Sequence, residues 1–365
     1  MPATDPITAA RAVVTGAVLD RTFPAAVVEV GDSGGVLWRE AFGTLTFEPA
    51  SAAADDHTIF DLSSLTKPIA TTSVIMQLES EGVVRASDRV SLFFEEWRGP
   101  DRESTTVQDL LEHASGLAAR LVDAPPEDRR EFEHDICTMR LECPPRTRSI
   151  YSDLGFILLG FMAADRGAAP LATQFDRILG RLRAAAHPGF DDANDMLAFA
   201  VPGEKRHRTA PTSPLDEDLR RGRMLIGEAH DNYAAALGGV AGHAGLFGTA
   251  PAVGVFARTL LAAARGDATI PQPLTQNQVA RVTTRSTVPG SSRALGWDTM
   301  LTTSSCGAHL SSAAFGHVGF TGTSLWVDPI LDRYFVLLTN RACGTGTKGA
   351  MRVVRRAFHD ALARL

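Results

Sequence analysis

The sequence predicts an α/β part combined with an all-α part. We expect one antiparallel sheet built from both ends of the chain and flanked by the terminal helices, with a helical domain inserted between them. Two observations predict this arrangement. Strand-like patterns occur near both ends of the chain, whereas the middle shows mainly helical spacing of apolar residues. A sheet shared by both termini is the economical architecture for such a pattern.

The first part of the chain predicts a helix followed by a β-hairpin. Apolar residues at helical spacing predict an amphipathic helix over 7–19. Strands are expected over 25–30 and 36–42, joined by the turn at 31–35.

The middle of the chain, from Lys67 to about Arg281, predicts helices separated by two long connections. The expected helices lie over 69–78 ending at Gly82, 107–113 ending at Gly116, 155–164, and 252–264 between Thr249 and Gly266. The connections 122–148 and 191–231 are rich in Pro, Arg and Asp. Because long loops in compact proteins are often functional, we expect them to act as lids or binding loops.

The strand pattern returns after Pro289. Strands are expected over 294–300, 313–320, 324–327 and 334–339, followed by a closing helix over 348–365. The predicted domains are therefore a discontinuous sheet domain, residues 1–66 and 285–365, and an inserted helical domain, residues 67–284.

Composition excludes several classes of protein. The 365 residues are 44% hydrophobic and 21% charged, with a net charge of −6, which describes an ordinary globular protein and argues against a nucleic-acid partner. Residues 1–20 lack the pattern of a signal peptide, and the longest apolar stretch, 156–164, is too short to span a membrane, so we expect a cytoplasmic location. The four cysteines have no Cys-x-x-Cys spacing and indicate neither a zinc site nor a disulfide framework.

The pair Ser64 and Lys67 is the first candidate for chemistry. The chain has only three lysines, Lys67, Lys205 and Lys348, and uses arginine for its other strong cations. Unlike arginine, a lysine beside a serine can lose its proton and accept the hydroxyl proton. Residues three apart share a helix face, so Lys67 can reach Ser64 at the start of the predicted helix.

Two further segments carry candidate residues. Tyr151 precedes the predicted helix over 155–164, and a phenol near an ammonium group can pass protons between nucleophile and leaving group. His317 and Gly319 lie on one face of the predicted strand over 313–320, where the bare glycine leaves room for a ligand. A backbone N–H near Phe320 can serve an oxyanion hole.

Other patterns are absent or weak. The glycine-rich segment 238–245 has neither Rossmann nor Walker spacing, so no nucleotide cofactor is expected. The chain also lacks the Gly-x-Ser-x-Gly elbow of α/β-hydrolases. His230 and Asp231 are metal-like side chains, but no helical His-x-x-x-His pair accompanies them, and we expect no metal site.

The segments Ser64-Leu65-Thr66-Lys67, Tyr151-Ser152-Asp153 and His317-Val318-Gly319, in this order, resemble the motifs of serine hydrolases related to class C β-lactamases and penicillin-binding proteins. The surrounding segments 60–63, 111–117, 238–247 and 320–326 also resemble that family, so the resemblance covers nearly the whole chain. It implies a β-lactamase/transpeptidase-like fold.

The resemblance also implies a mechanism. Ser64 attacks a carbonyl carbon, Lys67 and Tyr151 relay its proton, and the backbone N–H groups of Ser64 and Phe320 hold the oxyanion. An acyl-enzyme forms and water releases it. The substrate would be a small ester, amide or lactam, without a cofactor or metal. The substrate-binding residues implied by the resemblance are Asp153, His317, Gly319 and His243.

Two departures from the family pattern concern the substrate. His317 stands where the family often has Lys, and a largely neutral imidazole is a weaker partner for a substrate carboxylate. Asp153 stands where the family often has Asn and adds negative charge. Both changes favour an ester or amide hydrolase over a β-lactamase or a D-alanyl peptidase.

Three alternatives stay open at this point. The first is a D-alanyl or D-amino-acid peptidase or a β-lactamase, which the resemblance implies. The departures at Asp153 and His317 are also consistent with a catalytically weak module that binds cell-wall fragments. Composition alone suggests a metal-dependent amidase that uses His230, Asp231 and His243.

Overall fold

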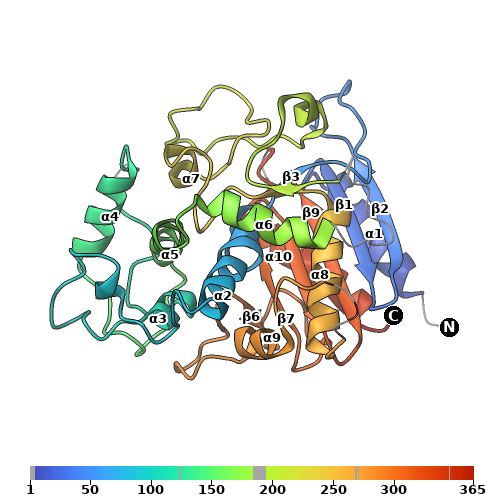
Figure 1. Cartoon of the computed structure of the whole chain (residues 1–365). Helices are drawn as coiled ribbons and strands as arrows, with labels where there is room; N and C mark the ends of the chain where they lie inside the picture. Colours follow the sequence, from blue (N-terminus) through green and yellow to red (C-terminus); the bar gives the residue numbers. More distant parts are fainter. Residues whose placement is uncertain (1–4, 123–124, 184–194, 268, 270, 345) are drawn as a thin grey trace.

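The computed structural model describes residues 5–122, 125–183, 195–267, 269, 271–344 and 346–365. Both ends of the chain contribute to one six-stranded antiparallel sheet with the order β2-β1-β9-β8-β7-β6 (Figure 1). The strands are β1 (Ala25–Gly31), β2 (Val36–Gly43), β6 (Asp298–Thr299), β7 (Phe315–Val318), β8 (Ser324–Asp328) and β9 (Arg333–Thr339). The N-terminal hairpin joins the C-terminal strands where β1 pairs with β9, as Val28 does with Leu337. This arrangement confirms the predicted fold class.

Helices cover both faces of the sheet. The terminal helices α1 (Pro6–Leu19) and α10 (Lys348–Leu362) pack together on one face, and α8 (Ala250–Ala264) packs on the other (Figure 1). Alternate residues of β1 divide between the two layers, since Val28 belongs to the core with the terminal helices and Val27 to the core with α8. The central strands are therefore buried on both faces, which explains their nearly continuous apolar character.

The remaining helices form the helical part beside the sheet. They are α2 (Ser73–Ser80), α3 (Val107–Leu111), α4 (Arg129–Thr138), α5 (Asp153–Arg166), α6 (Leu171–Arg183), α7 (Asn232–Ala236) and α9 (Gln276–Thr283). The proposed domain boundaries at 66/67 and 284/285 stay a prediction.

Several local predictions were wrong. The connection 122–148 contains α4, which Asp128 caps by accepting the Glu131 N–H. Helix α6 was not predicted, although Leu171, Phe175, Ile178 and Leu182 are buried along one of its faces. Residues 123–124 and 191–194 of the two predicted connections lie outside the described residues.

The strands near the site are shorter than expected. The predicted strand over 294–300 reduces to β6, because Gly296 adopts a positive φ of 77° and a Cβ there would lie 1.9 Å from Thr72 Oγ1. The predicted strand over 313–320 reduces to β7, which ends at Val318.

A second, three-stranded sheet sets the position of the site. It has the order β3 (Phe60–Asp61), β5 (Phe247–Gly248), β4 (Leu197–Ala198). The pairing of β3 with β5 continues into the hydrogen bond from the Leu62 N–H to the Leu246 carbonyl, 2.9 Å long. It therefore brings the segment before Ser64 beside the end of the glycine-rich segment 238–245.

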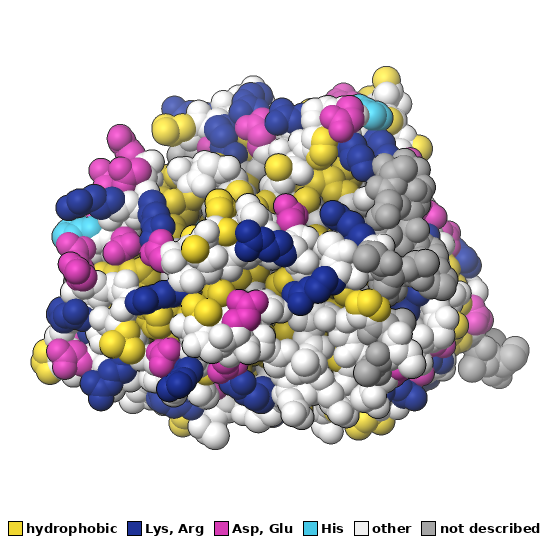
Figure 2. Space-filling view, in the orientation of Figure 1, with side chains coloured by type: hydrophobic (Ala, Val, Ile, Leu, Met, Phe, Trp, Pro, Cys, Tyr) yellow, Lys and Arg dark blue, Asp and Glu magenta, His cyan; other side chains and the backbone are white. Residues whose placement is uncertain are grey.

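Within the described residues, no single helix has both the length and the apolar character of a membrane span; only α5 and α6 taken together do, and they are bent by 78°. On the face drawn in Figure 2, basic and acidic side chains are interspersed.

Candidate active site

Ser64 lies in an irregular helical segment rather than at a simple helix start. A 3₁₀ turn, Ser63–Leu65, leads into a π-helical turn, Lys67–Thr72, and then into α2. Ser63 has a positive φ of 49°, which is uncommon for a residue other than glycine. Because π-helical turns and strained backbone often occur at functional sites, the local conformation by itself marks this segment.

The Lys67 ammonium group is buried and uses three hydrogen bonds. Its Nζ lies 3.0 Å from Ser64 Oγ, 2.7 Å from Asp153 Oδ1 and 3.2 Å from the His243 carbonyl oxygen. Burial alone would lower the pKa of Lys67, but the Asp153 carboxylate, together with Tyr151, outweighs it and raises the pKa. An ammonium group has three N–H donors, so Lys67 in this state donates to Ser64 rather than accepting from it.

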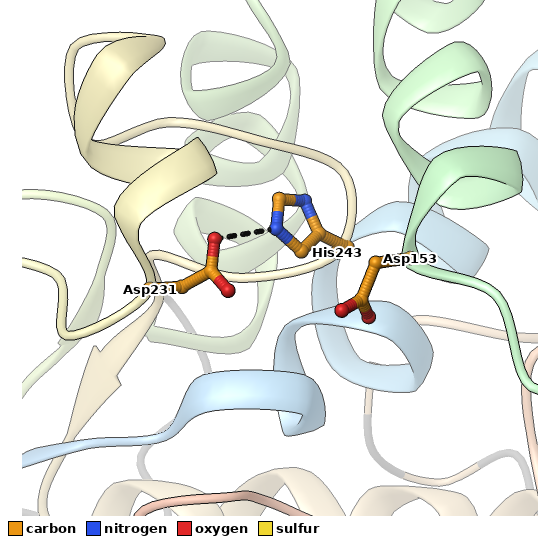
Figure 3. A group of neighbouring side chains, drawn as sticks. All are labelled: Asp153, Asp231 and His243. Atoms are coloured by element: carbon orange, nitrogen blue, oxygen red, sulfur yellow. Dashed lines mark hydrogen bonds and ion pairs between the residues drawn. The ribbon is translucent and has the colours of Figure 1, made fainter. Parts of the chain in front are cut away.

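Asp153, the first residue of α5, also pairs with Arg120. The Arg120 guanidinium lies 3.0 Å from Asp153 Oδ2 and 2.7 Å from Asp231 Oδ2, and His243 Nε2 lies 2.7 Å from Asp231 Oδ1 (Figure 3). Burial would raise the pKa of Asp153, but Lys67 and then His243 lower it below its ordinary value. Both carboxylates are therefore held as anions within a ring of contacts, here called the charge ring. It runs from Lys67 through Asp153, Arg120, Asp231 and His243 and is closed by the His243 backbone carbonyl, which accepts from Lys67.

The same geometry bears on metal binding. Ligand atoms of Asp153, Asp231 and His243 all lie within 4.8 Å of one another. However, Lys67 and Arg120 already form ion pairs with the two carboxylates, and a second positive ion would compete with them. His230 is not part of this group, because its ring stacks on that of Phe320 at 5.1 Å. His230, Asp231 and His243 thus line one pocket, but the close group of ligand atoms found among the described residues contains Asp153 in place of His230.

Tyr151 lies between two cations. The centroid of its ring is 4.8 Å from Lys67 Nζ and 4.9 Å from the Arg293 guanidinium carbon. The loop is fixed by Ser152, whose N–H donates to His113 Nδ1 over 3.0 Å and whose hydroxyl caps α5. Tyr151 is thus oriented by its neighbours within a positively charged environment.

His317 is buried and neutral. Its Nδ1 lies 2.9 Å from the Val318 carbonyl oxygen, and its Nε2 lies 3.4 Å from the Arg293 guanidinium. Burial, followed by Arg293 and Lys67, holds the pKa of His317 well below its ordinary value. At His317, β7 pairs with β8, while β6 pairs only with the preceding residues Phe315 and Gly316, so the edge of β7 is open beside the site.

Gly319 has a packing role that the sequence did not indicate, and its predicted role in substrate binding stays a prediction. A Cβ at this position would lie 2.1 Å from Thr323 Oγ1 and 2.6 Å from the Leu62 carbonyl oxygen. The absence of a side chain therefore allows the strand end to pack against the segment that carries the nucleophile, and Gly319 also lines the pocket.

The Phe320 N–H, predicted as an oxyanion donor, already has an acceptor. It donates to Ser63 Oγ over 3.1 Å. Ser63 is anchored in turn by Asp61, whose Oδ1 accepts the Ser63 N–H at 2.7 Å while its Oδ2 accepts the His230 N–H at 2.6 Å. Burial raises the pKa of Asp61 to about 6.

These residues surround a pocket of about 730 Å³. It is lined by Ser64, Tyr151, Asp153, His243, His317, Gly319 and Phe320, with Lys67 buried behind them. Its charged lining consists of Arg120, Arg293, Arg341, Lys348, Arg352 and Arg355 against Asp153, Glu217 and Asp231. Sequence reasoning missed Arg120, Arg293 and the hydroxyl of Ser63. Of these three, only Ser63 could have been noticed in the sequence, because it is a second serine directly before the proposed nucleophile Ser64.

Comparison with known proteins identifies the family of this chain. The family model described as Beta-lactamase matches residues 10–358. A protein of Escherichia coli (strain K12), provisionally named D-alanyl-D-alanine carboxypeptidase, is 27% identical over 84% of this chain and 76% of its own length. The N-acetylmuramyl-L-alanine amidase of Bacillus subtilis (strain 168) is 28% identical over 87% of this chain and 77% of its own length.

A solved structure supports the fold. The class C beta lactamase from Rhodobacter sphaeroides superimposes with a TM-score of 0.74 at 17% identity, covering 98% of this chain and 99% of the other.

Proposed function

Because the chain belongs to the beta-lactamase family, we propose that it is a serine hydrolase that cleaves an ester or amide bond of a small substrate through an acyl-enzyme on Ser64. The observation that carries the proposal is the buried Lys67 ammonium, 3.0 Å from Ser64 Oγ, at the wall of a pocket large enough for a small molecule.

The charge state of Lys67 supports a division of roles between Lys67 and Tyr151. Asp153 keeps Lys67 protonated, so the proton of the Ser64 hydroxyl passes to Tyr151 as Oγ bonds to the substrate carbonyl carbon. Tyr151 receives this proton between two cations, since Lys67 Nζ and the Arg293 guanidinium carbon lie 4.8 and 4.9 Å from the centroid of its ring. Tyr151 then returns the proton to the leaving oxygen or nitrogen as its bond to carbon breaks.

The carbonyl oxygen becomes an anion during attack and needs donors. In the proposed geometry it accepts from the backbone N–H groups of Ser64 and Phe320. The Phe320 N–H must first leave Ser63 Oγ, which therefore competes with the substrate for this donor. Water then attacks the acyl ester, and its proton follows the same route through Tyr151.

A second candidate is hydrolysis of an amide substrate that bears a carboxylate, such as a D-alanyl peptide. Arg293 favours it, since a guanidinium 3.4 Å from His317 Nε2 supplies at the open strand edge the positive charge that the neutral His317 lacks. The names of the E. coli and B. subtilis relatives, a carboxypeptidase and an amidase, agree with this candidate.

One substrate panel tests both candidates. Wild type and Ser64→Ala are compared on p-nitrophenyl esters, nitrocefin and D-amino acid amides, and in labelling by a fluorophosphonate probe. We expect labelling of Ser64 and ester or amide turnover in wild type only. Turnover that persists in Ser64→Ala would contradict the proposal. A loss of turnover in Arg293→Gln that is selective for nitrocefin, the member of the panel that bears a free carboxylate, with uncharged esters unaffected, would favour the carboxylate-bearing substrate.

A further inference from the structure

The peptide group between Gly319 and Phe320 carries the proposed oxyanion donor. Its N–H belongs to Phe320 and its carbonyl to Gly319, so a group that holds the carbonyl also sets the direction of the N–H. The Arg355 guanidinium donates to the Gly319 carbonyl over 2.6 Å and to the Thr323 carbonyl over 2.8 Å. Arg355, which also lines the pocket, therefore holds this peptide by its carbonyl oxygen.

The next peptide is held in the same way. Arg341 Nε donates to the Phe320 carbonyl over 2.9 Å, and its Nη1 donates to the Gly346 carbonyl over 2.7 Å. Its guanidinium carbon lies 4.5 Å from the centroid of the Phe320 ring. Both peptide groups of Phe320 are thus hydrogen-bonded to buried arginines.

These two arginines lack the partners that buried cations usually have. Arg355 is 8% exposed and Arg341 is 6% exposed. In the part of the chain that the structure describes, neither guanidinium lies within ion-pair distance of a carboxylate, and the hydrogen bonds above run to carbonyl oxygens. Burial, and then the nearby Arg341, lowers the pKa of Arg355 to about 9. An unpaired buried cation is costly to the fold, so its retention needs a reason.

We propose that Arg355, assisted by Arg341, is a positioning residue for the oxyanion hole. It orients the Gly319–Phe320 peptide and places positive charge behind the Phe320 N–H. A cation on the carbonyl of a peptide polarises the group and makes its N–H a stronger donor. The effect is largest in the transition state, when the substrate oxygen carries negative charge. This inference rests on the proposed function, because it needs an oxyanion at Ser64.

The test compares two substitutions that separate charge from hydrogen bonding. Arg355→Lys keeps the charge, whereas Arg355→Gln keeps an N–H donor without it. Arg356→Gln is the matched control, since the adjacent Arg356 also donates to carbonyls, those of Thr302 and Ser304, but does not line the pocket. For each variant we would measure kcat and KM for a p-nitrophenyl ester, the rate of fluorophosphonate labelling and the melting temperature.

We expect Arg355→Gln to lower kcat and the labelling rate about 10- to 100-fold with KM nearly unchanged, since loss of a whole oxyanion donor costs about 100- to 1,000-fold. Arg355→Lys should recover most of the loss, and Arg356→Gln should match wild type. A folded Arg355→Gln with wild-type rates, equal losses in the Lys and Gln variants, or an equal loss in Arg356→Gln would overturn the inference.

If Arg355→Gln does not fold, Arg341→Gln takes its place, and wild-type rates in that variant would also overturn the inference. Failure of the proposed function is distinguishable, because Ser64 would then not be labelled in the wild type itself.

Discussion

The substitution Asp153→Asn tests the charge ring of the site, because it removes one charge and keeps the shape of the side chain. Asp153 Oδ1 lies 2.7 Å from the Nζ of Lys67, which is fully buried. At an effective dielectric constant of about 20, two unit charges at that distance attract by about 6 kcal/mol. The amide oxygen of Asn can still accept a hydrogen bond from Lys67, and Arg120 still forms its ion pair with Asp231. Part of this interaction energy is therefore retained in the variant.

We therefore expect the free energy of unfolding near neutral pH to fall by about 3 kcal/mol, at the low end of the cost of breaking a buried ion pair. The pH dependence has a defined sign. The pKa of Lys67 is raised above its ordinary value of 10.5, so its contribution is full below that pH and is lost as pH rises through the raised pKa. The pKa of Asp153 is lowered below 3.8, so its contribution is full above that pH and is lost as pH falls.

The assay is urea unfolding of both proteins across pH. The difference between them should be largest near neutral pH. It should shrink as pH falls through the lowered pKa of Asp153, and as pH rises through the pKa of Lys67 in the variant, which burial lowers once Asp153 is removed. Glu142→Gln is the control, because Glu142 pairs with Arg148 at 3.3 Å on the surface and its loss should cost less than about 1 kcal/mol. A difference for Asp153→Asn no larger than that of the control would refute the charge ring.

Three further predictions concern the segment around the nucleophile. Ser63→Ala removes the hydroxyl that accepts the Phe320 N–H, which frees this N–H for the oxyanion. Fluorophosphonate labelling should become about 2- to 10-fold faster, which corresponds to the energy of one ordinary hydrogen bond. Slower labelling would mean that the Ser63 hydroxyl assists catalysis. Wild-type kcat/KM should fall as pH drops through about 6, where protonation of Asp61 removes an acceptor, and Asp61→Asn should lack this limb of the pH profile. Gly319→Ala places a Cβ 2.6 Å from the Leu62 carbonyl oxygen and should cost about 1–3 kcal/mol in thermal unfolding; an unchanged melting temperature would contradict the close packing.

Local patterns in the sequence predicted the elements whose burial is regular. Helices α1 and α10 have one apolar face each, and β1, β2, β8 and β9 lie close to their predicted bounds. The prediction failed where a tertiary contact ends an element, as at Gly296, which turns the chain beside Thr72. Such an approach of backbone to a distant side chain leaves no periodic signal in the sequence.

The candidate site shows the same limit. The order of the motifs grouped Ser64, Lys67 and Tyr151. The structure places Ser64 and Tyr151 at one pocket, with the buried Lys67 Nζ 3.0 Å from Ser64 Oγ. The partners that set their charge states were not predictable, because Arg120 meets Asp153 from 33 residues away and Arg293 meets His317 from 24 residues away. In a chain with many arginines, no local pattern distinguishes these two from those on the surface.

The two departures from the family pattern are accounted for by these arginines. At position 317, histidine in place of lysine removes a positive charge from β7. The Arg293 guanidinium, which lies 3.4 Å from His317 Nε2, supplies a positive charge at the same edge of the strand. Having Asp153 in place of Asn adds a negative charge beside Lys67, and Arg120 pairs with its second oxygen at 3.0 Å. Taken alone, each pair carries the charge of the usual residue, Lys or Asn; Arg293 also lies 3.9 Å from Asp298, and Arg120 lies 2.7 Å from Asp231. Since a guanidinium stays protonated where a lysine can titrate, the site keeps its positive charge at the strand edge over a wider pH range. The substrate preference should consequently follow Arg293 rather than His317, so that Arg293→Gln changes selectivity for carboxylate-bearing substrates more than His317→Asn does.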